Sequence, residues 1–141
     1  MTGQTPEREA DTMAIRLLVV DDEEDFLESI VMRIALRGIE VHGVASGTAA
    51  LEYLEANPDQ IDVVLLDIKM PGMDGLETLR HIKASHPKLE TIVVTGHASQ
   101  EFSRLGRELG AYDYLIKPIR LDTILESIRA AYRNRRAKNP K

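Results

Sequence analysis

The sequence predicts an α/β fold in which a five-stranded parallel sheet is flanked by five helices. Five apolar segments begin roughly 20–30 residues apart, at residues 15–20, 39–44, 61–66, 91–95 and 112–116. The third and fourth segments are almost continuously apolar, which is typical of strands buried on both faces. Segments of helical period separate them, and strict strand–helix alternation indicates a parallel sheet with helices on both faces.

Each intervening helix carries an apolar stripe and a recognisable start or stop. The first stripe contains Leu27, Ile30 and Ile34, and the last contains Ile124, Leu125 and Ile128. Glycine favours the helix C-terminus, serine favours the N-cap, and an X-Pro pair ends a helix. The signals are Gly38 after the first helix, Ser46 before and Asn57-Pro58 after the second, His86-Pro87 after the third, and Ser99 before and Gly110 after the fourth.

Length and composition limit the classes of protein that fit. The 141 residues correspond to one ordinary domain. The absence of cysteine excludes disulfides, zinc ribbons, Fe–S clusters and thiol nucleophiles. No apolar run approaches the roughly 20 residues of a membrane span, and the first dozen residues are polar, unlike a secretory signal. We therefore expect a cytoplasmic protein with no membrane contact.

Charge is distributed unevenly along the chain. Residues 15–128 carry 20 acidic and 11 basic residues, whereas the segment from Arg129 onward has six basic residues and no acidic one. An acidic body argues against direct nucleic-acid binding. We expect a disordered tail over residues 1–13, a folded domain over 14–134 and a basic tail over 135–141. The basic end fits a helix C-terminus with a solvated tail, or a linker or contact for an acidic partner.

Charged and polar residues follow the predicted strands. Asp21 and Asp22 follow the first strand, Asp67 the third, Thr95 ends the fourth and Lys117 follows the fifth. Ligand sites of open parallel sheets lie beyond the carboxyl ends of the strands. Crowded carboxylates repel each other, so a divalent cation and a lysine would stabilise the cluster. Oxygen ligands without histidine or cysteine suit Mg²⁺ best.

The strand-end motifs in combination resemble the receiver domain of bacterial two-component response regulators, the CheY-like family. The resemblance covers about residues 14–134 and rests on four motifs in order. These are VVDDE (19–23), LDIKMPGMDG (66–75), VTG (94–96) and GAYDYLIKP (110–118). The resemblance implies a flavodoxin-like sheet of order 2-1-3-4-5.

The resemblance also implies a role for each residue of the site. Asp67 accepts a phosphoryl group from a phosphohistidine on a sensor histidine kinase or phosphotransfer protein. Asp21, Asp22, Asp67 and the backbone carbonyl of Lys69 hold Mg²⁺. Lys117 pairs with Asp67 and then with the phosphoryl group, and Pro118 follows a cis peptide bond.

Thr95 and Tyr114 are implied to form a switch. On phosphorylation the Thr95 hydroxyl moves to the phosphoryl group and the Tyr114 ring turns inward. The face built by the fourth helix, fifth strand and fifth helix then changes shape for a partner, and a phosphorylation-dependent homodimer would use it. Gly96 leaves the phosphoryl group open to water or to a phosphatase. Tyr112 has the wrong spacing to Lys117 for this role.

Three other functions were weighed against this one. Hydrolases that form an aspartyl phosphate resemble a sequence pattern in which a second Asp follows the nucleophile by two residues. This chain has Lys69 at that position, which argues against a hydrolase. A dinucleotide-binding module needs a glycine-rich turn after the first strand, where this chain has acidic residues. A pseudo-receiver scaffold should lack the nucleophile or the acidic pair.

The output of the domain is a separate question. We expect a stand-alone receiver, with an unknown downstream effector protein. The alternative is the receiver domain of a larger regulator, because residues 95–97 and 113–118 resemble receivers attached to enhancer-binding transcription factors.

Overall fold

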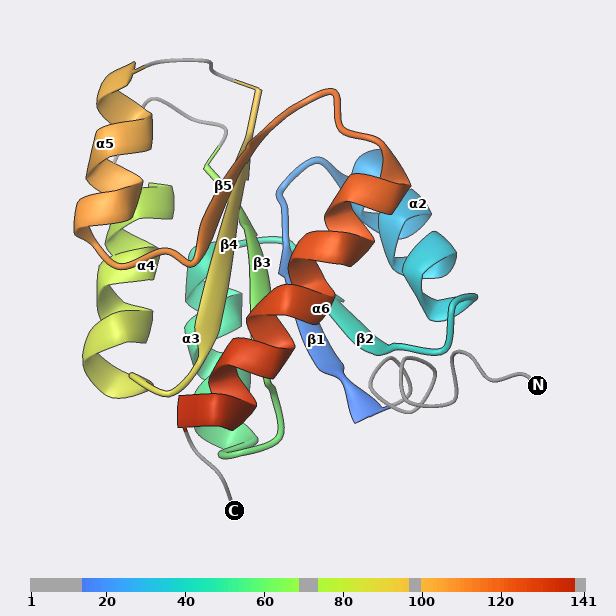
Figure 1. Cartoon of the computed structure of the whole chain (residues 1–141), viewed down its shortest axis with the longest axis horizontal. Coiled ribbons are helices and arrows are strands. Elements are labelled where there is room, and N and C mark those ends of the chain that lie inside the picture. Colours follow the sequence, from blue (N-terminus) through green and yellow to red (C-terminus); the bar gives the residue numbers. More distant parts are fainter. Residues whose placement is uncertain (1–13, 69–73, 97–99, 139–141) are drawn as a thin grey trace.

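A computed structural model describes residues 14–68, 74–96 and 100–138 of the chain (Figure 1). Over these residues, five strands alternate with five helices, as the sequence predicts. The elements are β1 Arg16–Val20, α2 Glu24–Ala35, β2 Glu40–Val44, α3 Gly47–Ala56, β3 Val63–Asp67, α4 Asp74–Ser85, β4 Glu90–Thr95, α5 Gln100–Glu108, β5 Asp113–Ile116 and α6 Leu121–Lys138.

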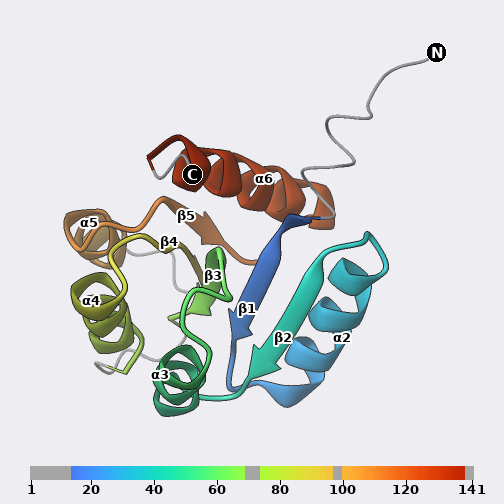
Figure 2. The ribbon, with the colours of Figure 1, turned by 90° about the horizontal axis from the view of Figure 1, so that it is seen from below.

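All neighbouring strands pair in parallel, and the sheet order is β2-β1-β3-β4-β5. Helices α2 and α6 cover one face of the sheet, and α3, α4 and α5 cover the other (Figure 2). Alternate residues of β1 therefore enter different cores: Leu17 and Val19 pack in the α2–α6 layer, Leu18 and Val20 in the other. This double burial explains the unbroken apolar runs of β3 and β4.

The helix signals that lie within the described residues are confirmed. The Ser46 hydroxyl accepts a hydrogen bond from the Ala49 amide at 3.0 Å and caps the start of α3, and Asn57 is the C-cap residue at its end. Gly38 and Gly110 follow α2 and α5 with φ of 93° and 94°, the left-handed conformation that glycine adopts most easily. Ser99 lies outside the described residues.

The expected basic tail from residue 135 is wrong at its start, because α6 continues to Lys138. Arg135 pairs with Asp62 at 3.2 Å, and Lys138 pairs with Glu90 at 2.7 Å. Both carboxylates are only 3% exposed, so the last helical turns are anchored to buried charges at the base of the sheet. Residues 1–13 and 139–141, the rest of the expected tails, lie outside the described residues.

No helix in the described part of the chain is both long enough and apolar enough to span a bilayer.

Candidate functional site

The carboxyl ends of the central strands place the predicted site residues at one edge of the sheet. Asp67 is the last residue of β3 and Thr95 the last of β4, while Asp21 and Lys117 directly follow β1 and β5. Backbone hydrogen bonds continue past the strands: the Asp21 amide donates to the Val44 carbonyl at 3.1 Å, and the Lys117 amide to the Thr95 carbonyl at 2.7 Å. The backbone hydrogen bonds of the sheet therefore fix the positions of the Cα atoms from which these side chains project.

Three carboxylates meet at this edge. Asp21, Asp22 and Asp67 each offer an oxygen within 4.8 Å of the other two. The side chains of Asp21 and Asp67 are 2% and 3% exposed, whereas Asp22 is exposed. Asp21 Oδ1 accepts the Glu23 amide at 2.8 Å, which holds this carboxylate in place. Oδ1 of Asp67 is buried and has no hydrogen-bond partner among the described residues.

Lys117 supplies positive charge to the cluster. Its Nζ lies 3.1 Å from Asp21 Oδ2 and 3.3 Å from Asp67 Oδ2, so one ammonium bridges two buried carboxylates. The same nitrogen lies 4.0 Å from the centroid of the Phe26 ring. The peptide bond between Lys117 and Pro118 is cis. One lysine is therefore held by residues from the ends of β1 and β3 and from α2.

Burial, followed by the negative charge of Asp21, raises the pKa of Asp67 from 3.8 to about 7. The Lys117 ammonium acts in the opposite direction, but it does not offset burial and repulsion. The carboxylate of Asp67 is thus poorly stabilised by protein groups alone. Additional positive charge at this edge would favour its ionised form.

Thr95 and Tyr114 lie on the same face of the sheet. Val93 pairs with Tyr114 and Thr95 with Ile116 in the β4–β5 ladder, which places Thr95 diagonally next to Tyr114. The Thr95 hydroxyl is buried and donates to the Ile68 carbonyl at 2.6 Å. The hydroxyl of Tyr114 is also buried, without a hydrogen-bond partner among the described residues, and burial raises its pKa.

The Tyr114 ring packs against α5. A Cβ placed on Gly106 would lie 3.2 Å from the ring, so glycine at this position leaves room for the aromatic side chain. The half-buried ring therefore lies beside α5 with its hydroxyl buried. At the end of β4, by contrast, a Cβ on Gly96 would meet no atom of the described residues within 4 Å.

The sequence model of the response regulator receiver domain family matches residues 17–129 of this chain, and this range includes all four strand-end motifs. The chain belongs to the response regulator receiver domain family. Receiver domains are phosphoacceptors of two-component signalling rather than classical enzymes. The sheet order 2-1-3-4-5 that the sequence resemblance implied is the order observed in this receiver domain.

Solved receiver domains have the same fold. A receiver domain from Clostridium thermocellum superimposes with a TM-score of 0.82 at 33% identity, over 88% of this chain and 98% of that one. A CheY-like receiver domain from Methanospirillum hungatei JF-1 gives a TM-score of 0.81 at 31% identity, over 89% of this chain and 98% of that one.

Curated relatives are longer proteins. The C4-dicarboxylate transport transcriptional regulatory protein DctD of Rhizobium meliloti (strain 1021) is 38% identical over 120 residues, which are 85% of this chain and 26% of DctD. The chain spans between about a quarter and about half of the length of the first relatives that it matches.

Receiver domains generally bind Mg²⁺ at an acidic pocket, and the groups of this receiver domain fit that ion. Asp67 Oδ1 is a buried oxygen without a donor among the described residues, and one carboxylate oxygen each of Asp21, Asp22 and Asp67 lie within 4.8 Å of one another. Such a set of hard oxygen ligands is typical of magnesium sites. Lys69, whose carbonyl was expected as a further ligand, lies outside the described residues.

A cavity of about 130 Å³ opens beside the carboxylates. It is lined by Asp21, Asp22 and Asp67 and by residues at the starts of α3 and α4, among them Gly47 and Thr78. A Cβ on Gly47 would collide with the Thr78 hydroxyl. The glycine therefore allows the two helices to approach each other next to the acidic cluster, a contact that the sequence did not indicate.

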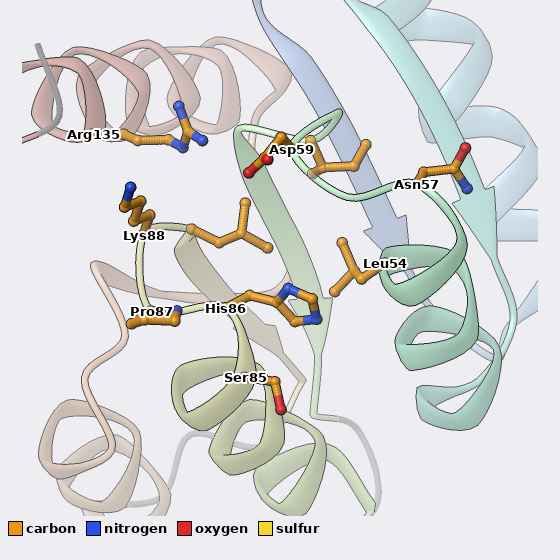
Figure 3. A pocket seen from close by; sticks show the side chains of 10 residues that line it. Leu54, Asn57, Asp59, Ser85, His86, Pro87, Lys88 and Arg135 are labelled. Carbon is orange, nitrogen blue, oxygen red and sulfur yellow. The ribbon is translucent and has the colours of Figure 1, made fainter. Parts of the chain in front are cut away.

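A second hollow, of about 200 Å³, lies at the opposite end of the sheet, where β3 and β4 begin (Figure 3). Leu54 and Leu89 line it together with the charged side chains of Asp59, Lys88 and Arg135. None of the predicted site residues in the described part of the chain is in its lining. The predicted site residues Asp21, Asp22 and Asp67 line the first cavity and not this one.

Proposed function

We propose that Asp67 is the phosphoacceptor of this receiver domain, with Mg²⁺ held by Asp21, Asp22 and Asp67. The donor would be a phosphohistidine on a sensor histidine kinase or phosphotransfer protein. The proposal is carried by one observation. A nearly buried Asp67 lies within 4.8 Å of two further carboxylates and 3.3 Å from the Lys117 ammonium, at the end of a central strand.

The proposed reaction moves a phosphoryl group between two nucleophiles. A bond forms between an Asp67 carboxylate oxygen and phosphorus, while the bond from phosphorus to the donor nitrogen breaks and its electron pair remains on nitrogen. A carboxylate needs no base once it is ionised. Mg²⁺, when bound, supplies the positive charge that phosphoryl transfer requires. The lone pairs of Asp67 Oδ1 are not used by any described donor, which suits this oxygen both as the nucleophile and as a ligand of Mg²⁺.

Lys117 would work on both sides of the transfer. Before it, the ammonium pairs with Asp67 Oδ2 at 3.3 Å. After it, the same group would pair with a phosphoryl oxygen, because charge-assisted hydrogen bonds to phosphate are strong. Asp21, which also contacts Nζ at 3.1 Å, keeps the lysine near the site during the exchange.

The output would pass through Thr95 and Tyr114 to the α5–β5–α6 face. The Thr95 hydroxyl would leave the Ile68 carbonyl for a phosphoryl oxygen, and this would stabilise the inward position of Tyr114. The buried hydroxyl of Tyr114 supports a two-state equilibrium in which the inward ring is accessible without phosphate. An effector protein or a second copy of the chain would read the changed face.

The relatives bear on the setting of the domain. DctD and the regulatory protein AtoC of Escherichia coli are about four times as long as the matched region. They favour, in part, the alternative that the receiver domain acts within a larger regulator over the expected stand-alone receiver. The effector stays unspecified in either case.

Phosphorylation should depend on the metal. We expect the protein to gain one phosphoryl group when incubated with acetyl phosphate and Mg²⁺, because added positive charge both ionises Asp67 and neutralises the phosphoryl oxygens. Intact-mass spectrometry measures the gain, with excess EDTA as the control. Equal modification in EDTA would contradict the proposed role of the acidic pocket.

The acidic pocket can be separated from the nearby acidic helix start. We expect Asp22→Ala to weaken Mg²⁺ binding by at least about 10-fold, since a ligand is lost. The matched Glu24→Ala variant removes an exposed carboxylate from the first turn of α2 and should change the affinity by less than about 2-fold. Calorimetric titration with Mg²⁺ measures both affinities. Equal losses would show that the metal is held elsewhere.

A further inference from the structure

The Phe26 side chain lies against the Lys117 ammonium of the site. The Nζ of Lys117 is 4.0 Å from the centroid of its ring, within the range of a cation–π interaction. Phe26 is in the first turn of α2, and its half-buried ring also packs against the core layer between α2 and α6. The sequence offers a simple explanation for Phe26 as core filling, but the ring contacts the ammonium as well.

The ammonium has three N–H donors, and two carboxylates are within hydrogen-bond distance of it. An aromatic face attracts the remaining positive charge electrostatically. In this site that property matters, because three carboxylates are already crowded within 4.8 Å of one another. A fourth carboxylate next to Lys117 would add repulsion, whereas a ring attracts the cation without adding a negative charge.

We propose that Phe26 is a positioning residue that holds the Lys117 ammonium at the acidic cluster through a cation–π contact. The inference rests on the proposed function of Asp67 and Lys117. Lys117 has to exchange a carboxylate oxygen for a phosphoryl oxygen during transfer, so its attraction to Asp67 changes. Its attraction to the Phe26 ring does not depend on the state of Asp67. The ring therefore keeps the ammonium in place while the acceptor is modified.

A series of substitutions separates this role from packing. Phe26→Tyr keeps the aromatic face and should phosphorylate at close to the wild-type rate with acetyl phosphate and Mg²⁺. Phe26→Leu keeps apolar bulk without a ring face and should be about 3- to 10-fold slower, the effect of a cation–π contact of ordinary strength. Incorporation of mono- and pentafluorophenylalanine at position 26 should slow the reaction stepwise, because fluorine weakens the negative face while the ring keeps nearly the same size.

Spectroscopy gives a readout that does not require phosphorylation. In the wild-type protein, ring-current shifts should move the Lys117 ε-methylene NMR signals upfield, and these shifts should disappear in Phe26→Leu. The aromatic control is Tyr53→Leu. Tyr53 lies on α3, away from Lys117, and its ring stacks on that of His42 with the two centroids 4.2 Å apart. Its phosphorylation rate and Lys117 shifts should match those of the wild type. In a Lys117→Ala background, Phe26→Leu should have no further effect on the rate.

The outcomes are distinguishable. Rates that fall with fluorination, together with the Lys117 shift and no additional effect in the Lys117→Ala background, support the positioning role. Rates unchanged by fluorination, or equal losses from Phe26→Leu with and without Lys117, would overturn it and leave Phe26 as a packing residue. If wild-type protein and Asp67→Asn are modified to the same extent, the proposed function fails instead, whatever the Phe26 variants do.

Discussion

At pH 8 in the absence of divalent metal, the Asp67→Asn variant is expected to be more stable than the wild-type protein by about 2 kcal/mol, although it should accept no phosphoryl group. Burial and the neighbouring Asp21 raise the pKa of Asp67 from 3.8 to about 7. At about 1.4 kcal/mol per pKa unit, full relief of this penalty has an upper limit of about 4 kcal/mol. The asparagine amide recovers only part of it, because its N–H donors face the Lys117 ammonium.

The pH dependence gives the sign of this effect. The folded protein binds a proton on Asp67 more readily than the unfolded chain does, so wild-type stability falls as pH rises from about 4 to about 7. The asparagine variant has no such loss. The advantage of the variant should therefore be largest above pH 7 and turn into a deficit near pH 4, where Asp67 is protonated and free of the penalty while the amide donors of the variant still face Lys117. Urea unfolding at several pH values, in EDTA, measures it. A variant that is less stable than the wild type at pH 8 would contradict the electrostatic account of the site.

The second large effect is expected at the base of the sheet, where Asp62→Asn should lower the free energy of unfolding by about 3 kcal/mol. The side chain of Asp62 is 3% exposed, accepts three hydrogen bonds from Arg16 and forms an ion pair with Arg135. Its Oδ2 accepts the Arg16 amide at 3.0 Å and Nε at 3.1 Å; its Oδ1 contacts Arg16 Nη2 at 3.0 Å and Arg135 Nη1 at 3.2 Å. Because both oxygens are used, either orientation of an asparagine amide turns a donor toward an arginine.

Asp59→Asn is the matched control, because it makes the same chemical change at a position three residues before Asp62. Asp59 is exposed, and its φ of 63° is one that asparagine tolerates, so the change should stay within about 0.5 kcal/mol. Both variants can be compared by urea unfolding at pH 7. Similar stabilities for the two variants would mean that the buried ion pairs do not anchor α6, and a fall in Asp62→Asn alone supports the anchor.

The fold was predictable because the signals on which it depends are local. The doubly buried strands are continuous apolar runs, and Ser46, Gly38 and Gly110 mark helix ends by their own backbone or side-chain preferences. The position of the site followed from the parallel sheet, since residues after successive strands must share one edge. The clustering of Asp21, Asp67 and Lys117 is thus a consequence of topology.

The contacts that the sequence did not predict join residues distant in the chain. In the sequence, Asp62 and Glu90 look like ordinary loop acids, so the sequence alone predicts a tail for the basic end. In the structure, α6 brings Arg135 and Lys138 over these two carboxylates. Phe26 looks like one more apolar residue of an amphipathic helix, because nothing local indicates that Lys117 approaches its ring. Side-chain pairing across elements depends on packing details that strand and helix periods do not encode.

Identification of the modified residue tests the central claim most directly. Protein treated with acetyl phosphate and Mg²⁺ can be reduced with borohydride, which converts an aspartyl phosphate to homoserine and marks its position for peptide mass spectrometry. We predict homoserine at position 67 alone in the wild-type protein, and none in Asp67→Asn. Homoserine at another aspartate of the wild-type protein, or undiminished phosphorylation of Asp67→Asn, would contradict the assignment of Asp67 as the acceptor.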